Sequence, residues 1–129
     1  MLKLIEYPSL YVILKLPIGS QIPSAVYSSL FYSISNSDSE LSLIFDQKLL
    51  DSSNDRTYSS EDWKLLKLFG NFDFYETGVL LKLIEPLAES NIGIMAVSTF
   101  DTDYLLIQSK NFKLAKSKII KNYKIILFT

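Results

Sequence analysis

Two segments of this chain resemble each other closely enough to limit how it can fold. Residues 33–44 align with residues 96–107 at an offset of 63, with Ser, Asp, Leu and Ile recurring identically and Ile/Val, Ser/Thr and Glu/Asp recurring conservatively. Each segment places polar turn residues between two apolar runs, which is the pattern of a β-hairpin. Hairpin turns favour Asp and Ser in any case, so chance similarity is the competing interpretation. The order of the elements around each hairpin decides between the two.

The first half predicts three strands and one short helix. The strand-like runs are rich in Tyr, Val, Ile and Leu and cover residues 9–16, 30–35 and 40–46. Pro23 is suited to the first position of a short helix that extends to about Ser29. Residues 51–62 are polar and resemble a linker. The first half therefore predicts a divergent unit over residues 1–62 that lacks a second helix.

The second half predicts a complete βαββαβ unit over residues 63–129. Its strands are expected at 63–69, 92–100, 103–108 and 124–128, and its helices at 78–91 and 112–123. The first helix has the clearest pattern, because four apolar residues recur at the spacing of one buried stripe: Leu80, Leu83, Ile84 and Leu87. Thr77 is its expected N-cap, and Pro86 is expected to kink or widen it. The fold class is therefore α+β and ferredoxin-like, with a mostly antiparallel sheet and helices on one face.

Composition excludes several kinds of site. The chain has no Cys and no His, so disulfides, thiolate nucleophiles, Cys/His zinc sites and His-based triads are all excluded. The net charge of −1 offers no basic footprint for nucleic acid, and the lysines near the C-terminus are interpreted as the solvated face of the last helix. The apolar run at residues 10–14 is too short to span a membrane. We expect a cytoplasmic protein that binds neither nucleic acid nor membrane.

The motifs, taken in order, resemble a known family. The matching stretches are Trp63–Leu68, Asp73–Phe74, Thr77–Leu80, Glu85–Glu89, Ile92–Ile94 and Ser98–Tyr104, with weaker matches at Ile22–Pro23, Phe31–Ile34 and Glu40–Ile44. This series resembles the ACT-domain family, in particular small tandem-ACT proteins related to CASTOR-type amino-acid sensors and to aspartokinase regulatory regions. The resemblance implies two tandem ACT units, one over residues 1–62 and one over residues 63–129.

The resemblance also implies binding rather than catalysis. ACT units of this kind pair side by side and hold an amino acid or related metabolite at the seam, so a homodimer is expected. Gly78 matches a glycine at a helix start where a side chain would obstruct the ligand. Thr99, Phe100 and Asp103 match positions that contact the amino acid.

The same residues have a physical interpretation. Free N–H groups at the helix start, around Thr77, Gly78 and Val79, can hold a carboxylate. The expected partners on the hairpin are the hydroxyls of Ser98 and Thr99, an apolar wall from Phe100 and an anionic group for a ligand amine from Asp103. The competing interpretation is purely structural: the acidic residues only close the turn, Phe100 belongs to the core, and Gly78 only opens a helix.

Other functions receive less support. Asp101 and Asp103, with Asp38 and Glu40 in the repeat, could be interpreted as a carboxylate metal site, but no calcium loop with its Gly follows them. No cofactor is expected, and the lack of His and Cys argues against an enzyme. The main hypothesis is a regulatory module that binds an amino acid. The alternative is a dimerisation protein that keeps the fold and has no ligand.

Overall fold

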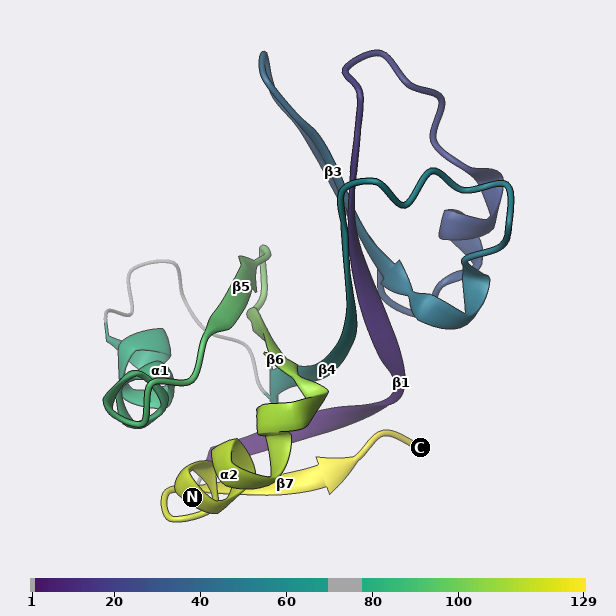
Figure 1. Ribbon diagram of the computed structural model, residues 1–129. Helices are drawn as coiled ribbons and strands as arrows, with labels where there is room; N and C mark the ends of the chain where they lie inside the picture. Colours follow the sequence, from purple (N-terminus) through teal and green to yellow (C-terminus); the bar gives the residue numbers. More distant parts are fainter. Residues whose placement is uncertain (1, 70–77) are drawn as a thin grey trace. The chain divides into compact units, whose positions relative to one another are not determined.

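The computed structural model describes residues 2–69 and 78–129, and it divides the chain into two compact units (Figure 1). One unit combines residues 1–8 with residues 63–129 and contains both α-helices, and we call it the helical unit. The other spans residues 9–62, and we call it the insert because it interrupts the helical unit in sequence. Strands β1 (Leu2–Leu16) and β4 (Ser59–Phe69) run through both units.

The helical unit has the predicted order strand, helix, strand, strand, helix, strand. After β4 come α1 (Val79–Glu89), β5 (Ile94–Ser98), β6 (Asp103–Gln108), α2 (Ser109–Ile119) and β7 (Tyr123–Leu127). Strand β6 is antiparallel to both β4 and β5. The closing strand β7 is parallel to the first residues of β1, from Leu2↔Tyr123 to Glu6↔Leu127. Residues 2–6, to which no element was assigned from the sequence, therefore supply a strand of this unit.

Helix α1 buries the predicted stripe. Leu83 and Leu87 are fully buried, and Leu80 and Ile84 pack against the same core cluster. The helix ends with Asn91 at a positive φ of 56°, where the Asn91 N–H donates to the Ala88 carbonyl and the Ile92 N–H donates to the Leu87 carbonyl. This is a Schellman ending, with Ile92 and Leu87 in hydrophobic contact across it. The helix is continuous through Pro86.

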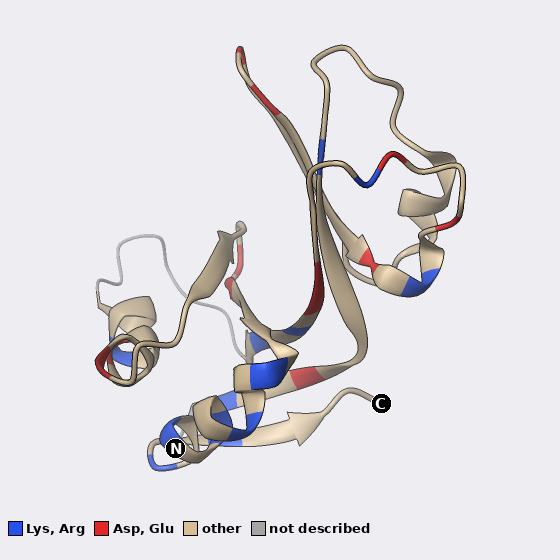
Figure 2. Ribbon diagram, viewed as in Figure 1, with Lys and Arg blue, Asp and Glu red and all other residues tan. Residues whose placement is uncertain are grey.

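Helix α2 begins earlier and ends earlier than predicted. It covers Ser109–Ile119 rather than 112–123, and Ala115 and Ile119 are buried as expected. Three of its four lysines are exposed and Lys118 is half-buried, and Figure 2 shows blue along the helix, which supports the solvated-face interpretation. In the part of the chain that the structure describes, no helix is long and apolar enough to cross a membrane.

The insert is a small antiparallel unit with two 3₁₀ turns in place of α-helices. These turns are η1 (Ser24–Ser28), before β2 (Ser33–Asn36), and η2 (Gln47–Leu49), after β3 (Leu41–Asp46). Strand β3 is antiparallel to both β1 and β2. The core cluster of the insert contains Val12, Leu14, Leu16, Val26, Leu41, Leu43 and Phe45. The predicted short helix is therefore a 3₁₀ turn with Pro23 as its N-cap, and a second 3₁₀ turn occupies the place where no helix was expected.

The stretch predicted as a linker is shorter than residues 51–62, because β4 already begins at Ser59. Its remainder is a pair of tight polar turns. Asp51 accepts hydrogen bonds from the backbone and hydroxyl of Ser53, and these lower the pKa of the Asp51 carboxyl. Asp55 accepts the same pair from Thr57, with the same effect on its pKa. Short Asx turns of this kind explain the Ser and Asp content.

The two hairpins match at an offset of 62, not 63. The last strand pairs are Asn36↔Leu41 in the insert and Ser98↔Asp103 in the helical unit. The closing bonds correspond as well, since the Ser37 N–H donates to the Glu40 carbonyl and the Thr99 N–H donates to the Thr102 carbonyl, both at 2.8 Å. The alignment at 63 is therefore one residue out of register. A slip of one residue moves each side chain to the opposite face of its strand.

Candidate functional site

The tip of the β5–β6 hairpin holds most of the predicted ligand-binding residues. Strand β5 ends at Ser98 and β6 begins at Asp103, and these two residues pair across the hairpin. The Thr102 carbonyl closes the turn, since it accepts the Thr99 N–H at 2.8 Å and the Thr99 hydroxyl at 3.0 Å. The structure therefore brings Ser98, Thr99 and Asp103 together.

The carboxylate of Asp103 is bonded to a side chain of the facing strand. The Ser98 hydroxyl donates to its Oδ1 atom at 2.5 Å, and Asp103 is half-buried. A carboxylate accepts up to about four hydrogen bonds, so one donor leaves acceptor capacity on this group. Asp103 thus braces the hairpin and still offers negative charge.

The hairpin tip is anchored to β4 by a residue that had no role in the sequence analysis. Thr102 is only 5% exposed, and its hydroxyl donates to the Leu68 carbonyl at 2.7 Å. The strand register supports this contact, because Lys67 of β4 pairs with Tyr104 of β6. The anchor places the tip beside the end of β4. Nothing in the sequence separates Thr102 from the other polar residues of the tip.

Phe100 lies at the outer end of the turn. Its side chain is 78% exposed, so the alternative that it belongs to the core is wrong. Asp101 beside it is also exposed. An aromatic ring presented in this way can serve as one wall of a binding site.

Gly78 is the N-cap of α1, a position predicted for Thr77. Its φ of 79° lies in the left-handed region that favours glycine, and its carbonyl accepts the Lys82 N–H at 3.0 Å. A Cβ on Gly78 would meet no atom within 4 Å, so backbone conformation rather than crowding explains the glycine in this ligand-free structure. Val79 follows and packs against the core. Thr77 lies outside the described residues.

The predicted site thus consists of two groups. The hydrogen bonds of the tip join its residues to one another and to β4, and Gly78 and Val79 take part in none of them. Within residues 2–69 and 78–129, no three acidic side chains are close enough to hold a metal ion.

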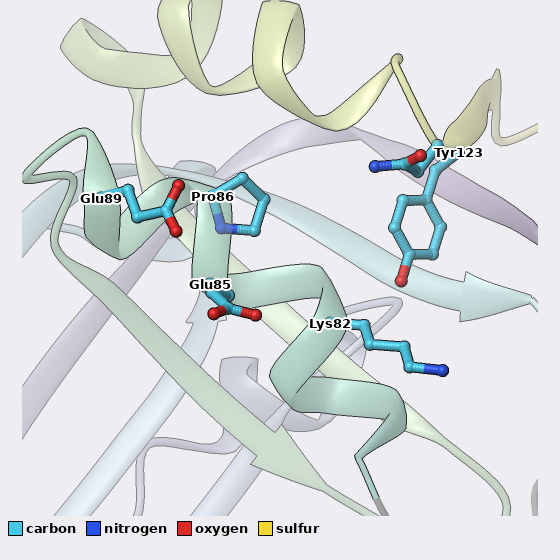
Figure 3. Close-up of a pocket in the computed structure, with 6 residues that line it drawn as sticks. Lys82, Glu85, Pro86, Glu89 and Tyr123 are labelled. Atoms are coloured by element: carbon cyan, nitrogen blue, oxygen red, sulfur yellow. The ribbon is translucent and has the colours of Figure 1, made fainter.

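The helical unit also contains an open groove of about 590 Å³, away from all the predicted site residues that the structure describes. It lies between α1 and the turn that leads into β7 (Figure 3). Its lining residues are Lys82, Glu85, Pro86, Glu89, Asn122 and Tyr123. The sequence analysis assigned no function to this set.

Comparison with known proteins supplies the family. Residues 58–118 match the model of the ACT domain. The protein Atu0741 from Agobacterium tumefaciens is similar at 30% identity and a TM-score of 0.88, over 99% of this chain and 94% of that one. Protein VC0802 from Vibrio cholerae, described as a possible transport protein, has 14% identity and a TM-score of 0.69, over 93% of this chain and 88% of its own.

The regulatory subunit of aspartate kinase from Thermus thermophilus has the same fold at 12% identity. Its TM-score is 0.61, and the match covers 88% of this chain and 92% of that one. The α+β architecture and the match over residues 58–118 agree with the resemblance noted in the sequence. The chain therefore belongs to the same family as Atu0741, and its residues 58–118 match the ACT-domain model.

Proposed function

We propose that this protein is a regulatory module that binds an amino acid or a related metabolite and catalyses no reaction. The ligand would lie between the start of α1 and the β5–β6 tip, in contact with Thr77, Gly78, Val79, Ser98, Thr99, Phe100 and Asp103. The main support is the hydrogen bond from Thr102 to the Leu68 carbonyl. It holds the tip against β4, in the unit that also contains α1, and a ligand that contacts both groups would join the tip to the start of that helix.

The charges of the two groups suit a zwitterion. The N–H groups of the first turn of α1, at residues 79–81, have no acceptor within the helix and favour an anion such as a carboxylate. The Asp103 carboxylate can accept a ligand ammonium in addition to the Ser98 hydroxyl. The exposed Phe100 ring would cover an apolar part of the ligand.

We further propose that the insert is a second, reduced ACT unit and that the protein forms a homodimer in the cytoplasm. In the insert the strands follow the order β2, β3, β1, β4, which is the ferredoxin-like order for a βαββαβ unit. Among the strands that the structure describes, β5 of the helical unit lies at the end of the strand order and has one edge without a neighbour. A second copy could pair along that edge. The relation to CASTOR-type sensors stays a prediction.

The experiment is a thermal-shift screen of the twenty amino acids on three proteins: wild type, Asp103→Asn and Asp101→Asn. A bound ligand at about a hundred times its Kd stabilises the fold by about 2.7 kcal/mol, which is a measurable shift. We expect Asp103→Asn to lose the shift and Asp101→Asn, the matched neighbour, to keep it. A flat response of the wild type to every amino acid, at millimolar concentration, would refute the proposal.

A dimerisation protein without a ligand is the second candidate. It is favoured by the exposed Phe100 and by the open edge of β5, both of which could contact a second copy. Sedimentation separates the candidates. A stable dimer that no amino acid stabilises supports this second function, and a ligand-dependent shift supports the first.

A further inference from the structure

The groove beside α1 has an arrangement of charges that points to a ligand of its own. Lys82, Glu85, Pro86 and Glu89 recur at the i, i+3, i+4, i+7 spacing, so they form one face of the helix. Figure 3 shows Lys82 and Tyr123 at one end of the groove and the two carboxylates towards the other. The groove is therefore positive at one end and negative at the other.

Tyr123 supplies the observation that separates this groove from an ordinary charged surface. The residue is 5% exposed, it lines the groove, and Figure 3 shows its hydroxyl directed towards the end where Lys82 lies. Among the described residues its hydroxyl has no hydrogen-bond partner. The ring is thus buried while its hydroxyl opens into the groove, where a water or a ligand can bond to this oxygen. A phenol is protonated at neutral pH and can donate, and burial raises the pKa of Tyr123 further above its ordinary value.

Pro86 leaves one backbone carbonyl of α1 without its usual helical donor. Pro86 has no N–H, so the Lys82 carbonyl lacks the donor that an ordinary helix residue would provide four positions later. In the part of the chain that the structure describes, Lys82, Glu85 and Glu89 form no ion pair. This face of α1 thus offers two carboxylates and a backbone carbonyl as hydrogen-bond acceptors, together with the Lys82 ammonium as a donor.

We propose that this groove binds a small elongated zwitterion, with its carboxylate at Lys82 and Tyr123 and its ammonium at Glu85 and Glu89. Length follows from helix geometry, because Lys82 and Glu85 are separated by roughly 4.5 Å along the axis and Lys82 and Glu89 by roughly 10 Å. The two charges of a free α-amino acid are too close together to span the longer distance. A short peptide or a linear ω-amino acid fits the spacing, and the volume of about 590 Å³ admits either.

The test is a titration of the full chain followed by amide NMR. The probes are alanine, dialanine, trialanine and 6-aminohexanoate, with N-acetylated and C-amidated trialanine as controls. We expect trialanine or 6-aminohexanoate to shift the amides of residues 82–89 and 122–123, and alanine to shift them less. Both capped peptides should bind at least tenfold more weakly, since each lacks one charge. Trialanine binding alone indicates a peptide site, and 6-aminohexanoate binding alone indicates a linear amino-acid site.

Matched variants assign the contacts. Tyr123→Phe, and Glu85→Gln combined with Glu89→Gln, should each weaken binding roughly tenfold, while Tyr58→Phe and Glu40→Gln at exposed positions of the insert should leave it unchanged. Equal binding of the capped peptides, or no shift in the groove at millimolar probe, overturns the proposal. Asp103→Asn should not affect this binding, so failure here and failure of the hairpin site are distinguishable.

Discussion

The hydroxyl of Thr102 donates to the carbonyl of Leu68 at 2.7 Å, across a sequence separation of 34 residues. Both residues are buried, so the bond is shielded from water. It is the contact that fixes the β5–β6 tip against the end of β4. It also rigidifies the proposed ligand site, because Thr99 bonds to the carbonyl of the same Thr102.

Replacing Thr102 with Val should therefore loosen the tip. The two side chains have nearly the same shape, so the loss is the donor, and we expect a destabilisation of about 1–2 kcal/mol. Urea unfolding measures the loss, and amide exchange at residues 99–103 should accelerate. The control is Thr99→Val, which should cost less because Thr99 is an exposed residue and its hydroxyl bond to the Thr102 carbonyl is longer and less buried. Equal costs for the two variants would contradict the assigned role of Thr102.

Gly78→Ala should destabilise the protein through the backbone alone. The position has a φ of 79°, which an L-residue adopts at a cost of about 1–2 kcal/mol, while no atom lies within 4 Å of the added Cβ. Gly93→Ala is the matched control, because its Cβ is equally uncrowded and its φ is not in the left-handed region. Urea unfolding of the two variants gives the comparison.

The same pair of variants also probes the proposed ligand site. If a ligand approaches the start of α1, Gly78→Ala should additionally lose the amino-acid shift. Gly93→Ala should retain that shift. Stability as high in Gly78→Ala as in the wild type would show that the left-handed conformation at this position is not required.

Local patterns predicted the helical unit well and long-range pairing poorly. The α1 stripe was recognisable because four apolar residues at helical spacing face one core. The parallel pairing of residues 2–6 with β7 has no local signal, since the partners are more than a hundred positions apart. Glu6 also interrupts the apolar pattern there, and only the structure shows that Lys64 compensates its charge.

The hairpin tip was predictable as a polar turn, but its geometry was not. The polar tip was recognisable from Ser98 to Asp103, yet the anchor at Thr102 depends on a strand in a different part of the chain. The repeat was found one residue out of register, because similar residues occur at neighbouring positions in both turns. The hydrogen bonds from Ser37 and Thr99 define the true register of 62.

The ion pair of Glu6 with Lys64 should be sensitive to loss of one partner. The two groups are 3.0 Å apart with side chains only 12% and 18% exposed, and Lys116 is a second, longer contact at 3.8 Å. Lys64→Met leaves a poorly solvated carboxylate and should cost about 2 kcal/mol, whereas Glu6→Leu combined with Lys64→Met should recover most of the loss. A double-mutant cycle in urea measures the coupling.

The control for that cycle is an exposed ion pair in the insert. Arg56 and Glu61 are 3.9 Å apart and both are well exposed, so Arg56→Met should cost less than about 0.5 kcal/mol. A loss in Lys64→Met as small as this would show that burial does not strengthen the Glu6 interaction. If the double variant does not recover stability, the attraction between Glu6 and Lys64 contributes more to the free energy of unfolding than their desolvation costs.

Tyr7 should make the protein less stable in strong alkali. Burial, with a smaller contribution from Tyr104, raises the pKa of the Tyr7 phenol from 10.0 to about 12. The folded state thus favours the neutral phenol. Its contribution to stability is complete below pH 10 and is lost as the pH rises from 10 through 12, because the unfolded chain ionises first. The Tyr7 ring also stacks on Phe128 with centroids 5.0 Å apart, and Tyr7→Phe keeps that contact.

The measurement is a comparison of wild type, Tyr7→Phe and Tyr58→Phe in urea at pH 9 and pH 12, together with a spectroscopic titration of the phenolates. Tyr7→Phe should remove one late-titrating tyrosine and should lose less stability between the two pH values than the wild type. Tyr58 is 68% exposed, so its replacement should change neither result. An unchanged late phenolate signal in Tyr7→Phe would assign it to another ring, and Tyr123, whose pKa burial also raises, would then be the residue to replace.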